Sequence, residues 1–356
     1  MKHSMVISLL LAMLAATPIG LAAQNKAWAT LSNGVLTFSY GAKPKAPSQV
    51  KCNGCGRNVS SSSNFCSNCG AKIVKAFWVF DASANVADPT GGKWPLWRQA
   101  IYKGEFEEEY ITKVVFQASF KQATNIRSTR HWFHWLSNLT EIVGLEYLNT
   151  ANVTDMSHMF EGCEKLRRIN LSNFNTQNVT NMNALFSGCK SLTSIDVSRF
   201  NTSKVTDMGA MFCMCTKITQ INVSNFDTRN VINMYDMFSW CEGLTTINLS
   251  NFNTSKVTEM ERMFCACTNL KSVNVSKFNT SKVKRFCSMF DGCKSLTTLD
   301  ISNFVVKNAF CDHMFGDCVK LKTVYVSSQN WKPKVGDSAY GENILMYNCN
   351  ASFVKK

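Results

Sequence analysis

Proline and histidine are scarce in this chain of 356 residues, which contains only 6 prolines and 5 histidines. The low proline content argues against a disordered linker protein, because 45% of the residues are hydrophobic and can form a core. The sequence also lacks G-x-S-x-G, H-E-x-x-H, Walker and dinucleotide-binding motifs. We therefore expect a protein without enzymatic activity.

Acidic residues are also in the minority. The 24 Asp and Glu residues stand against 38 Lys and Arg residues, which gives a formal net charge of +14. Such a surface favours anionic partners, and it can equally serve only to keep a protein soluble. The net charge alone does not distinguish between binding of an anionic partner and a role in solubility.

Long apolar runs are absent except for one near the N-terminus. Lys2 and His3 precede an apolar stretch at 6–16, and the small residues Ala22 and Ala23 follow it. This order is typical of a secretory signal peptide, and the run is shorter than the ~20 residues that span a bilayer. We expect residues 1–23 to be a signal peptide. The mature chain, without a transmembrane segment, is then secreted, held at the cell surface or located in a periplasm.

One motif recurs at a fixed period after residue 139. A phenylalanine is followed three residues later by a cysteine in seven copies, and the steps are 26 residues long except for a last step of 25. The phenylalanines are Phe160, Phe186, Phe212, Phe238, Phe264, Phe290 and Phe315. A fixed period of this length predicts a solenoid, in which each coil is stabilised by its neighbours.

Each copy carries the signals of a strand, a turn and a short helix. Apolar and polar residues alternate at 195–197, which predicts a short half-buried strand, and the polar residues at 201–204 predict a turn. The apolar residues Met208, Met211, Phe212 and Cys215 have the spacing of one helix face. We therefore predict an α/β repeat in which the strands of successive coils form a parallel β-sheet.

A polar pair follows the strand of most copies. The first member is Asn175, Asn201, Asp227, Asn253 or Asn279, and a threonine comes directly after each. We expect these Asn and Asp side chains to hydrogen-bond the turn backbone of the next coil. Val305 and Val306 replace the pair in the sixth copy, which predicts that the array loosens toward its end.

The sequence Leu-Ser-Asn-Phe-Asn-Thr-Ser-Lys-Val-Thr-Glu-Met-Glu-Arg-Met-Phe at 249–264 resembles the repeat of the BspA-like leucine-rich-repeat surface proteins of bacteria. The likeness covers roughly 139–326 and extends more weakly to 111–116 and 144–150. It implies a leucine-rich-repeat solenoid in an exported protein. Such proteins are associated with adhesion to host surfaces, matrix proteins or other bacteria.

Four cysteines near the N-terminus have the spacing C-x2-C-x10-C-x2-C, and they are Cys52, Cys55, Cys66 and Cys69. Two such knuckles can supply four thiolates to one tetrahedral zinc ion, and the segment resembles short zinc-ribbon modules. We predict a structural zinc site whose binding drives the folding of this insertion. Two disulfides remain the alternative, because exported compartments favour them.

The seven in-register cysteines that follow the phenylalanines are predicted to be buried free thiols that pack as small apolar side chains. Cys287 and Cys311 lie at similar positions of neighbouring coils, and they are the one pair in the repeat that we consider a candidate disulfide. His131 and His134 have a spacing that could bind metal, but we expect them in an aromatic cap over the first coil. His158 and His313 are expected to be isolated.

A set of cations follows the strands of five successive copies, and it consists of Lys204, Arg229, Lys256, Lys282 and Lys307. If these residues align, they form a stripe roughly 20 Å long. We predict that this stripe could bind an extended anionic glycan, and the alternative is a solvated rim.

The predicted order along the chain begins with a signal peptide at 1–23 and the first strand of an N-terminal cap at 24–50. A zinc-ribbon insertion at 51–73 and the rest of a β-rich cap at 74–138 follow. The repeat solenoid then occupies 139–326, and a C-terminal cap occupies 327–356.

The expected function is binding to an extracellular protein or an anionic glycan, and nucleic acid is not an expected partner. The alternative is a structural component that assembles with copies of itself at the cell surface. The sequence does not indicate the oligomeric state or the identity of the ligand.

Overall fold

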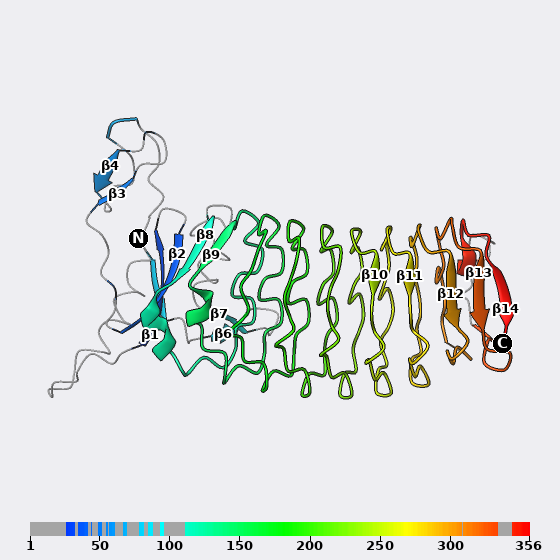
Figure 1. Cartoon of the computed structure of the whole chain (residues 1–356). Coiled ribbons are helices and arrows are strands. Elements are labelled where there is room, and N and C mark those ends of the chain that lie inside the picture. The colour runs from blue at the N-terminus through cyan, green and yellow to red at the C-terminus, as the bar shows by residue number, and fades with distance from the viewer. Residues whose placement is uncertain are drawn as a thin grey trace.

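The computed structural model describes residues 26–32, 35–41, 44, 49–51, 55, 57–60, 67–69, 78–81, 85–87, 93–95, 111–307, 309–333 and 344–356. The predicted signal peptide at 1–23 lies outside these residues. The described part is an elongated stack of coils with a strand-rich unit at its N-terminal end (Figure 1).

The N-terminal cap is built on a five-stranded sheet with the order β5-β1-β2-β8-β9. Its strands are β1 (Lys26–Ser32), β2 (Val35–Gly41), β5 (Trp78–Asp81), β8 (Lys113–Phe116) and β9 (Glu141–Val143). β1 pairs antiparallel with β2 and β5, whereas β8 runs parallel to both β2 and β9. The sheet therefore changes from hairpin pairing to the parallel pairing of a solenoid within one layer.

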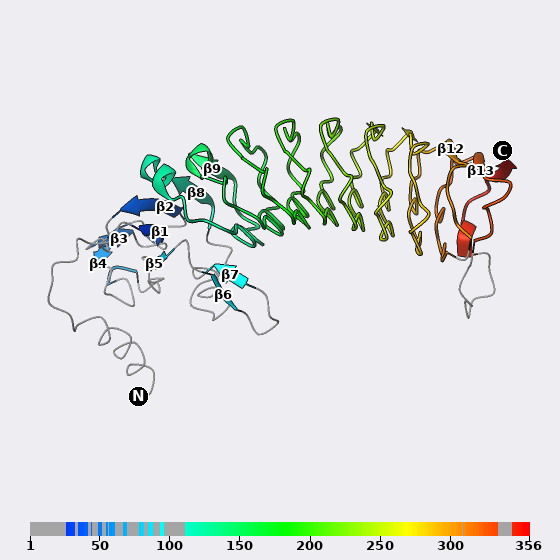
Figure 2. The ribbon, with the colours of Figure 1, turned by 90° about the horizontal axis from the view of Figure 1, so that it is seen from below.

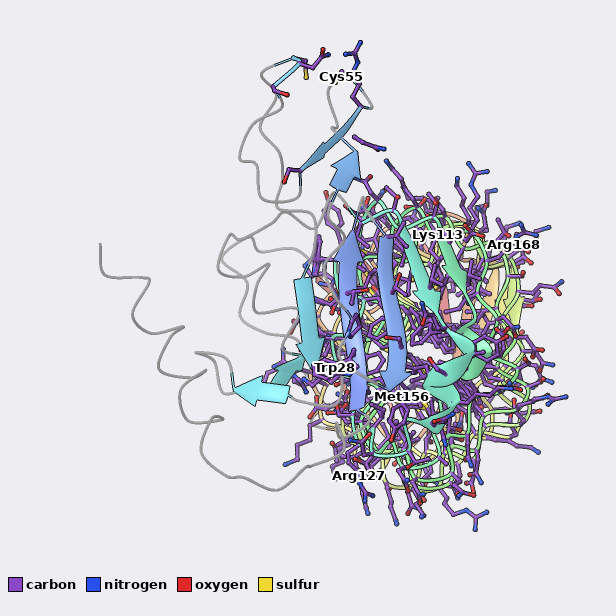
Figure 3. The ribbon with its side chains drawn as sticks, turned by 90° about the vertical axis from the view of Figure 1, so that its left-hand side faces the viewer. Trp28, Cys55, Lys113, Arg127, Met156 and Arg168 are labelled. Atoms are coloured by element: carbon purple, nitrogen blue, oxygen red, sulfur yellow. The ribbon has the colours of Figure 1, made fainter. Side chains whose placement is uncertain are left out.

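Two hairpins accompany this sheet, and they are β3 (Gln49–Lys51) with β4 (Asn58–Ser60), and β6 (Asn85–Ala87) with β7 (Lys93–Pro95). The β3–β4 hairpin projects away from the sheet, and Cys55 lies between its strands (Figures 1 and 3). β2 precedes this β3–β4 hairpin in the sequence, and β5 follows it.

The remaining strands lie toward the C-terminal end of the stack, and they are β10 (Thr246–Ile247), β11 (Ser272–Val273), β12 (Thr298–Ile301), β13 (Thr323–Val326) and β14 (Ser352–Lys355). β10 pairs with β11, and β12, β13 and β14 form a second group. All of these pairs are parallel. The predicted parallel stacking of coils is therefore confirmed.

The repeat phenylalanines form one continuous stack through the core. Phe212 and Phe238 lie with their ring centroids 5.7 Å apart and their planes 5° from parallel. The other neighbouring pairs from Phe160 to Phe315 have centroid distances of 5.5–6.2 Å. A second stack follows the strands, with Phe252, Phe278 and Phe304 at 6.4 Å spacing. Equivalent side chains thus form buried columns along the solenoid axis.

We call residues 155–164 and their equivalents in later coils (181–190, 207–216, 233–242, 259–268, 285–294 and 310–319) the corners of the solenoid. The prediction of a short helix at each corner is wrong. Within the described residues, the helical segments are the 3-10 turns η2 (Ala118–Gln122), η3 (Leu145–Tyr147) and η4 (Ile344–Met346). The corners consist of reverse turns, and two residues four positions apart have positive φ in each, such as Ala210 and Met214.

The reason lies in the direction of the backbone hydrogen bonds. The amides of Met208, Ala210, Phe212 and Met214 donate to the carbonyl oxygens of Asn233, Tyr235, Met237 and Ser239 in the next coil, at 2.7–3.0 Å. The intervening amides close local turns, as in the bond from Cys213 to Ala210. A helix would keep these bonds within its own segment. Here alternate bonds run between coils, so the corner is the most continuously bonded side of the stack.

The strand side is more open than the corner side. Backbone amides at 167–171, 193–197 and 219–223 donate no backbone hydrogen bond in the described part of the chain. The coils form a shallow arc, with β8, β9, β12 and β13 on its outer side (Figure 2). Coils must diverge on the outside of an arc, which accounts for the missing strand pairs in its middle.

In each polar pair, the threonine side chain forms the hydrogen bonds to the backbone of the next coil. The Asn or Asp side chain, for which these bonds were predicted, does not. Thr202 Oγ1 donates to the carbonyl of Asp227 at 3.0 Å and accepts from the amide of the same residue at 2.7 Å. Asn201 Oδ1 instead accepts from the amide of Ser203 in its own turn. The same two-way bond repeats in four other coils, at Thr150, Thr176, Thr228 and Thr254.

The prediction that the cysteines after the phenylalanines are buried thiols is confirmed, because all seven have exposed fractions of 0%. Each Sγ also donates to the carbonyl of a phenylalanine in the preceding coil, at 3.0–3.3 Å. Burial raises the pKa of the thiols from Cys189 onward. A cysteine at this position therefore supplies a small apolar side chain and a weak hydrogen-bond donor at once.

Aromatic residues close both ends of the phenylalanine stack. Phe38 stacks on Phe116 at 4.6 Å and on Trp132 at 5.1 Å at the N-terminal end. Trp331 and Phe353 contact Phe315 at the other end, at 6.4 and 6.0 Å. These rings cover apolar surface that would otherwise be exposed at the terminal coils.

The predicted loosening near the sixth copy is wrong. Val306 is fully buried, and the amide of Val305 donates to Thr280 Oγ1 at 2.8 Å. The buried valine replaces the threonine without interrupting the stack, and the four-residue strands β12 and β13 follow.

The corner conformation predicts a specific response to substitution at Gly188, whose φ is +71° and whose added Cβ would lie 3.2 Å from backbone atoms of Gly162. Gly188→Ala should lower the free energy of unfolding by about 1–2 kcal/mol, because a left-handed backbone disfavours a Cβ. The reverse change, Ala266→Gly at φ +57°, should cause no loss. Chemical denaturation measures both variants. A helix would give the opposite signs, so a stabilised Gly188→Ala variant would contradict the assignment.

Candidate functional site

We call the residues between the strand and the next corner (198–205, 224–231, 250–257, 276–283 and 302–309) the turn edge. All five predicted cations lie there and are exposed. Lys204, Lys256 and Lys282 occupy the same repeat position, and each directly precedes a buried valine, namely Val205, Val257 or Val283. Arg229 and Lys307 lie one residue earlier, so the five cations form two adjacent columns and not one stripe.

Several of these cations already contact neighbouring side chains. Lys204 Nζ donates to Asn178 Oδ1 at 2.8 Å, and Lys256 Nζ donates to Asn230 Oδ1 at 2.7 Å. Within the described residues, Arg229 is the one member of this set with a charged partner, and its Nε lies 2.9 Å from the carboxylate of Asp227. Contacts with neutral amides orient the lysine chains along the axis without removing their charge, so they remain able to attract an anion.

Charge is distributed unevenly around the solenoid. The turn edge holds seven cations and a single acidic residue, Asp227, and the cations are Arg199, Lys204, Arg229, Lys256, Lys277, Lys282 and Lys307. The seven corners hold 11 acidic residues and only four cations. Three of those four cations are paired with acids, as Arg262 is with Asp236 at 3.0 Å. The turn edge therefore carries an excess of positive charge, whereas the corners carry an excess of negative charge.

Two of the four predicted zinc ligands, Cys55 and Cys69, lie among the described residues and are exposed. Cys52 and Cys66 lie outside them. Arg57 Nη1, just after the first knuckle, donates to Asn68 Oδ1 in the second knuckle at 2.9 Å. This bond brings the two knuckles together, as a shared metal would require, and four thiolates are a donor set that suits zinc. Among the described residues, no group of three or more Cys, His, Asp or Glu side chains is arranged to hold a metal ion.

The histidines at the first two corners form a cluster that sequence reasoning missed. His131 stacks on His158 with ring centroids 4.6 Å apart, and His134 lies edge-on to His131 at 4.8 Å. Glu161 Oε2 lies 2.6 Å from His158 Nδ1 and 3.3 Å from His134 Nε2. The expectation that His158 is isolated is therefore wrong. His131 and His134 lie in a first corner at 128–137, which precedes the corner at 155–164, because Ser128 pairs with Asp155 and the ring of Phe133 lies 5.3 Å from that of Phe160.

The electrostatics of this cluster favour an ionised Glu161. Burial alone would raise the pKa of Glu161, but hydrogen bonds from His134 and His158, together with their charges, lower it to about 2. The carboxylate thus joins two successive coils at the point where the cap meets the repeat.

The other candidate residues of the sequence analysis, Cys287, Cys311 and His313, have fewer side-chain contacts than the histidine cluster. Cys287 Sγ lies 3.8 Å from Asp312 Oδ2, and no disulfide joins Cys287 and Cys311. Burial is the main cause that raises the pKa of both thiols, in Cys311 to about 12. His313 lies edge-on to Tyr347 at 6.1 Å. No helix in the described part of the chain is long and apolar enough to cross a membrane.

The fold and its surfaces define a repeat protein, a parallel solenoid of about eight coils with charge separated between its turn edge and its corners. A family model described as "Mycoplasma protein of unknown function, DUF285" matches residues 127–246 and 241–338. These matches cover more than half of the chain, and the protein therefore belongs to this family. The match agrees with the resemblance to BspA-like repeat proteins that the repeat sequence indicates.

A solved structure of a leucine-rich repeat protein from Bacteroides ovatus is similar to the chain at 15% sequence identity. The alignment covers 69% of this chain and 85% of that chain, with a TM-score of 0.26. No curated protein matches the sequence.

The Glu161 cluster predicts a pH-dependent contribution to stability. A carboxylate whose pKa is lowered by folding stabilises the protein above its unfolded pKa of about 4.5, and the contribution is lost as the pH falls toward 2. Glu161→Gln should therefore lower the free energy of unfolding at pH 7 by about 1–2 kcal/mol, after solvent screening is allowed for. Denaturation of both proteins from pH 7 to pH 2.5 tests this. A gap between the proteins that stays constant or widens below pH 4.5 would refute it.

Proposed function

We propose that the protein is an exported, non-catalytic binding scaffold, and that its turn edge binds an acidic extracellular polymer such as a sulfated or carboxylated glycan. The observation that carries the proposal is the excess of seven cations over one acid on five successive turns. The signal-like residues at 1–23 support export. The family described above supports a repeat scaffold and names no ligand.

Three features of the turn edge suit this role. Its cations are exposed, and Lys204 and Lys256 are held by neutral amides, so their charge is available. The two cation columns are extended along the solenoid axis, as an extended polymer requires. The rigid stack beneath them fixes the spacing before binding, which reduces the entropy lost on association.

A second candidate, lateral self-association, draws on the same charge separation. The basic turn edge of one copy would complement the acidic corners of another, and repeated contacts of this kind would give an array. Light scattering at low and high salt separates the two candidates. A monomer at low salt favours the binding of an external polymer, whereas salt-sensitive oligomers favour assembly.

We also propose that Cys52, Cys55, Cys66 and Cys69 hold one structural zinc ion in the insertion. The Arg57–Asn68 bond between the knuckles supports their close approach. Metal analysis of the reduced, purified chain should give about one zinc per chain, and a Cys55→Ser/Cys69→Ser variant should give none. Less than half a zinc in the unaltered chain would refute the site, and the thiols would then be tested for disulfides.

The proposed binding surface predicts the behaviour of charge-reversal variants on immobilised heparin. Lys256→Glu/Lys282→Glu should elute at clearly lower salt than the unaltered protein, because it removes two of the positions that face the polymer. The matched control, Lys294→Glu/Lys320→Glu, makes the same change in net charge at exposed residues away from the turn edge. Equal elution of the two variants would show that net charge alone governs retention and would refute the turn edge as the site.

A further inference from the structure

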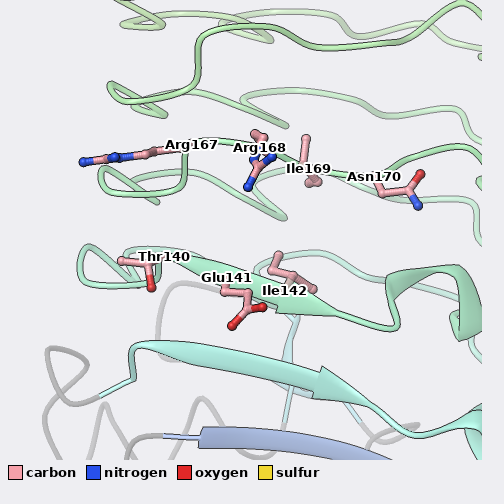
Figure 4. A pocket seen from close by; sticks show the side chains of 7 residues that line it. All are labelled: Thr140, Glu141, Ile142, Arg167, Arg168, Ile169 and Asn170. Atoms are coloured by element: carbon pink, nitrogen blue, oxygen red, sulfur yellow. The ribbon is translucent and has the colours of Figure 1, made fainter.

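An open pocket of about 440 Å³ lies on the strand side, between the coil of β9 and the next coil. Its residues are Thr140, Glu141, Ile142, Arg167, Arg168, Ile169 and Asn170. Arg168 points into the space between the two coils, above Glu141, and Arg167 lies at one end of the pocket (Figure 4). The pocket is apart from the turn edge, because it is formed by strand residues and not by the turns.

The two arginines of this pocket lack anionic partners in the described part of the chain. Arg130, Arg229, Arg262 and Arg285 each form an ion pair. No ion pair or hydrogen bond involves the side chain of Arg167 or Arg168 among the described residues, and both residues are exposed. Glu141, the nearby acid, is already paired with Lys113 at 2.8 Å. The pocket therefore has two guanidinium groups whose charge is not neutralised.

The backbone contributes further donors to the same place. β9 pairs with β8 on one side, but no strand of the described chain pairs with it on the side of Arg167 and Arg168. The amides of residues 167–170 donate no backbone hydrogen bond within the described chain. Free amides beside arginines are donors suited to an oxyanion, and a guanidinium can hold a carboxylate or sulfate through two parallel bonds.

The repeat shows that these arginines are local additions. The 26-residue period places Thr193, Thr219 and Thr245 at the position of Arg167, and Ser194, Gln220 and Thr246 at that of Arg168. Neutral side chains thus occupy the same positions in the three following coils. The arginines are not needed for packing, because both residues are exposed.

The other residues of the pocket suit a sugar ring. Ile142 and Ile169 are half-buried and provide an apolar surface between the coils. Asn170 uses its Oδ1 in its own turn, bonded to the amide of Ser172, which leaves its side-chain NH2 group as a donor. The carboxylate of Glu141 can accept from a hydroxyl group. The pocket thus combines two arginines with one carboxylate, one amide and an apolar surface.

We propose that this pocket binds one carboxylate or sulfate group of an acidic saccharide, with Arg167 and Arg168 holding the acid group and Glu141 and Asn170 contacting its hydroxyls. The proposal rests on the proposed function, and it adds a second site that recognises a single charged sugar unit. The turn edge supplies long-range attraction, whereas the pocket selects the acid group.

Calorimetric titration at low salt with glucuronate, glucose 6-sulfate and neutral glucose tests the pocket. The two acidic sugars should bind saturably, and glucose should bind at least about tenfold more weakly, since a charge-assisted bond contributes roughly that factor. Arg167→Gln/Arg168→Gln should weaken acidic-sugar binding by about tenfold or more. A preference for one acidic sugar over the other identifies the acid group as carboxylate or sulfate.

The matched control is Lys271→Gln, which removes an exposed cation from the position of Arg167 in a later coil. It should bind acidic sugars like the unaltered protein. Equal binding of glucose and the acidic sugars, or equal losses in the control and the arginine variant, would overturn the pocket. The turn edge is judged separately by heparin elution of Lys256→Glu/Lys282→Glu, so either site can fail without the other.

Discussion

The donation of alternate corner amides to the carbonyls of the next coil holds the coils in register. In the corner at 207–216, four such bonds join one coil to the next, and the same pattern recurs along the array. Because the bonds run along the axis, each coil depends on its neighbour for backbone pairing as well as for burial. The stacked phenylalanines, the cysteine thiols and the threonine bonds all lie in columns that this register fixes.

The register also explains which surfaces are available for function. Residues at the corners and in the core are committed to contacts between coils, whereas the turn edge and the strand side are not. On the turn edge, the position held by Lys204 and Lys256 is occupied by Asn178 and Asn230 in other coils. The valine that follows this position is buried in all four coils. On the strand side, the divergence of coils after β9 opens the pocket beside Arg168. Charge and shape can therefore change on these two sides while the stack is preserved.

The period of the repeat, the phenylalanine stack, the buried thiols and the parallel coils could be predicted from sequence, because apolar spacing depends on burial alone. The corner conformation could not, because a helix and a pair of turns with left-handed residues four apart bury the same positions. The choice between them depends on where the amides donate, which is a contact between coils. Glycine directly before Cys163, Cys189 and Cys293 was the available signal, since glycine in that position disfavours a helix.

The surface was predictable only in part. The five cations do lie on one edge, but counting back from the buried residue of each turn, which is Val231 for Arg229 and Ala309 for Lys307, would have placed these two cations one position earlier than the lysines of the other turns. The histidine cluster was hidden because the step from Phe133 to Phe160 is 27 residues and the first corner lacks the cysteine. The pocket could not be predicted, because it arises from the divergence of coils and not from any motif in the residues that line it.

Hydrogen exchange measured along the chain tests the central claim most directly. If corner bonds hold the coils together, amides at 208–215 and 234–241 should exchange most slowly, and amides at 193–197 and 219–223 should exchange much faster. A conventional parallel sheet would give its strands the greatest protection. Strand amides that exchange as slowly as the corner amides, or more slowly, would contradict the account.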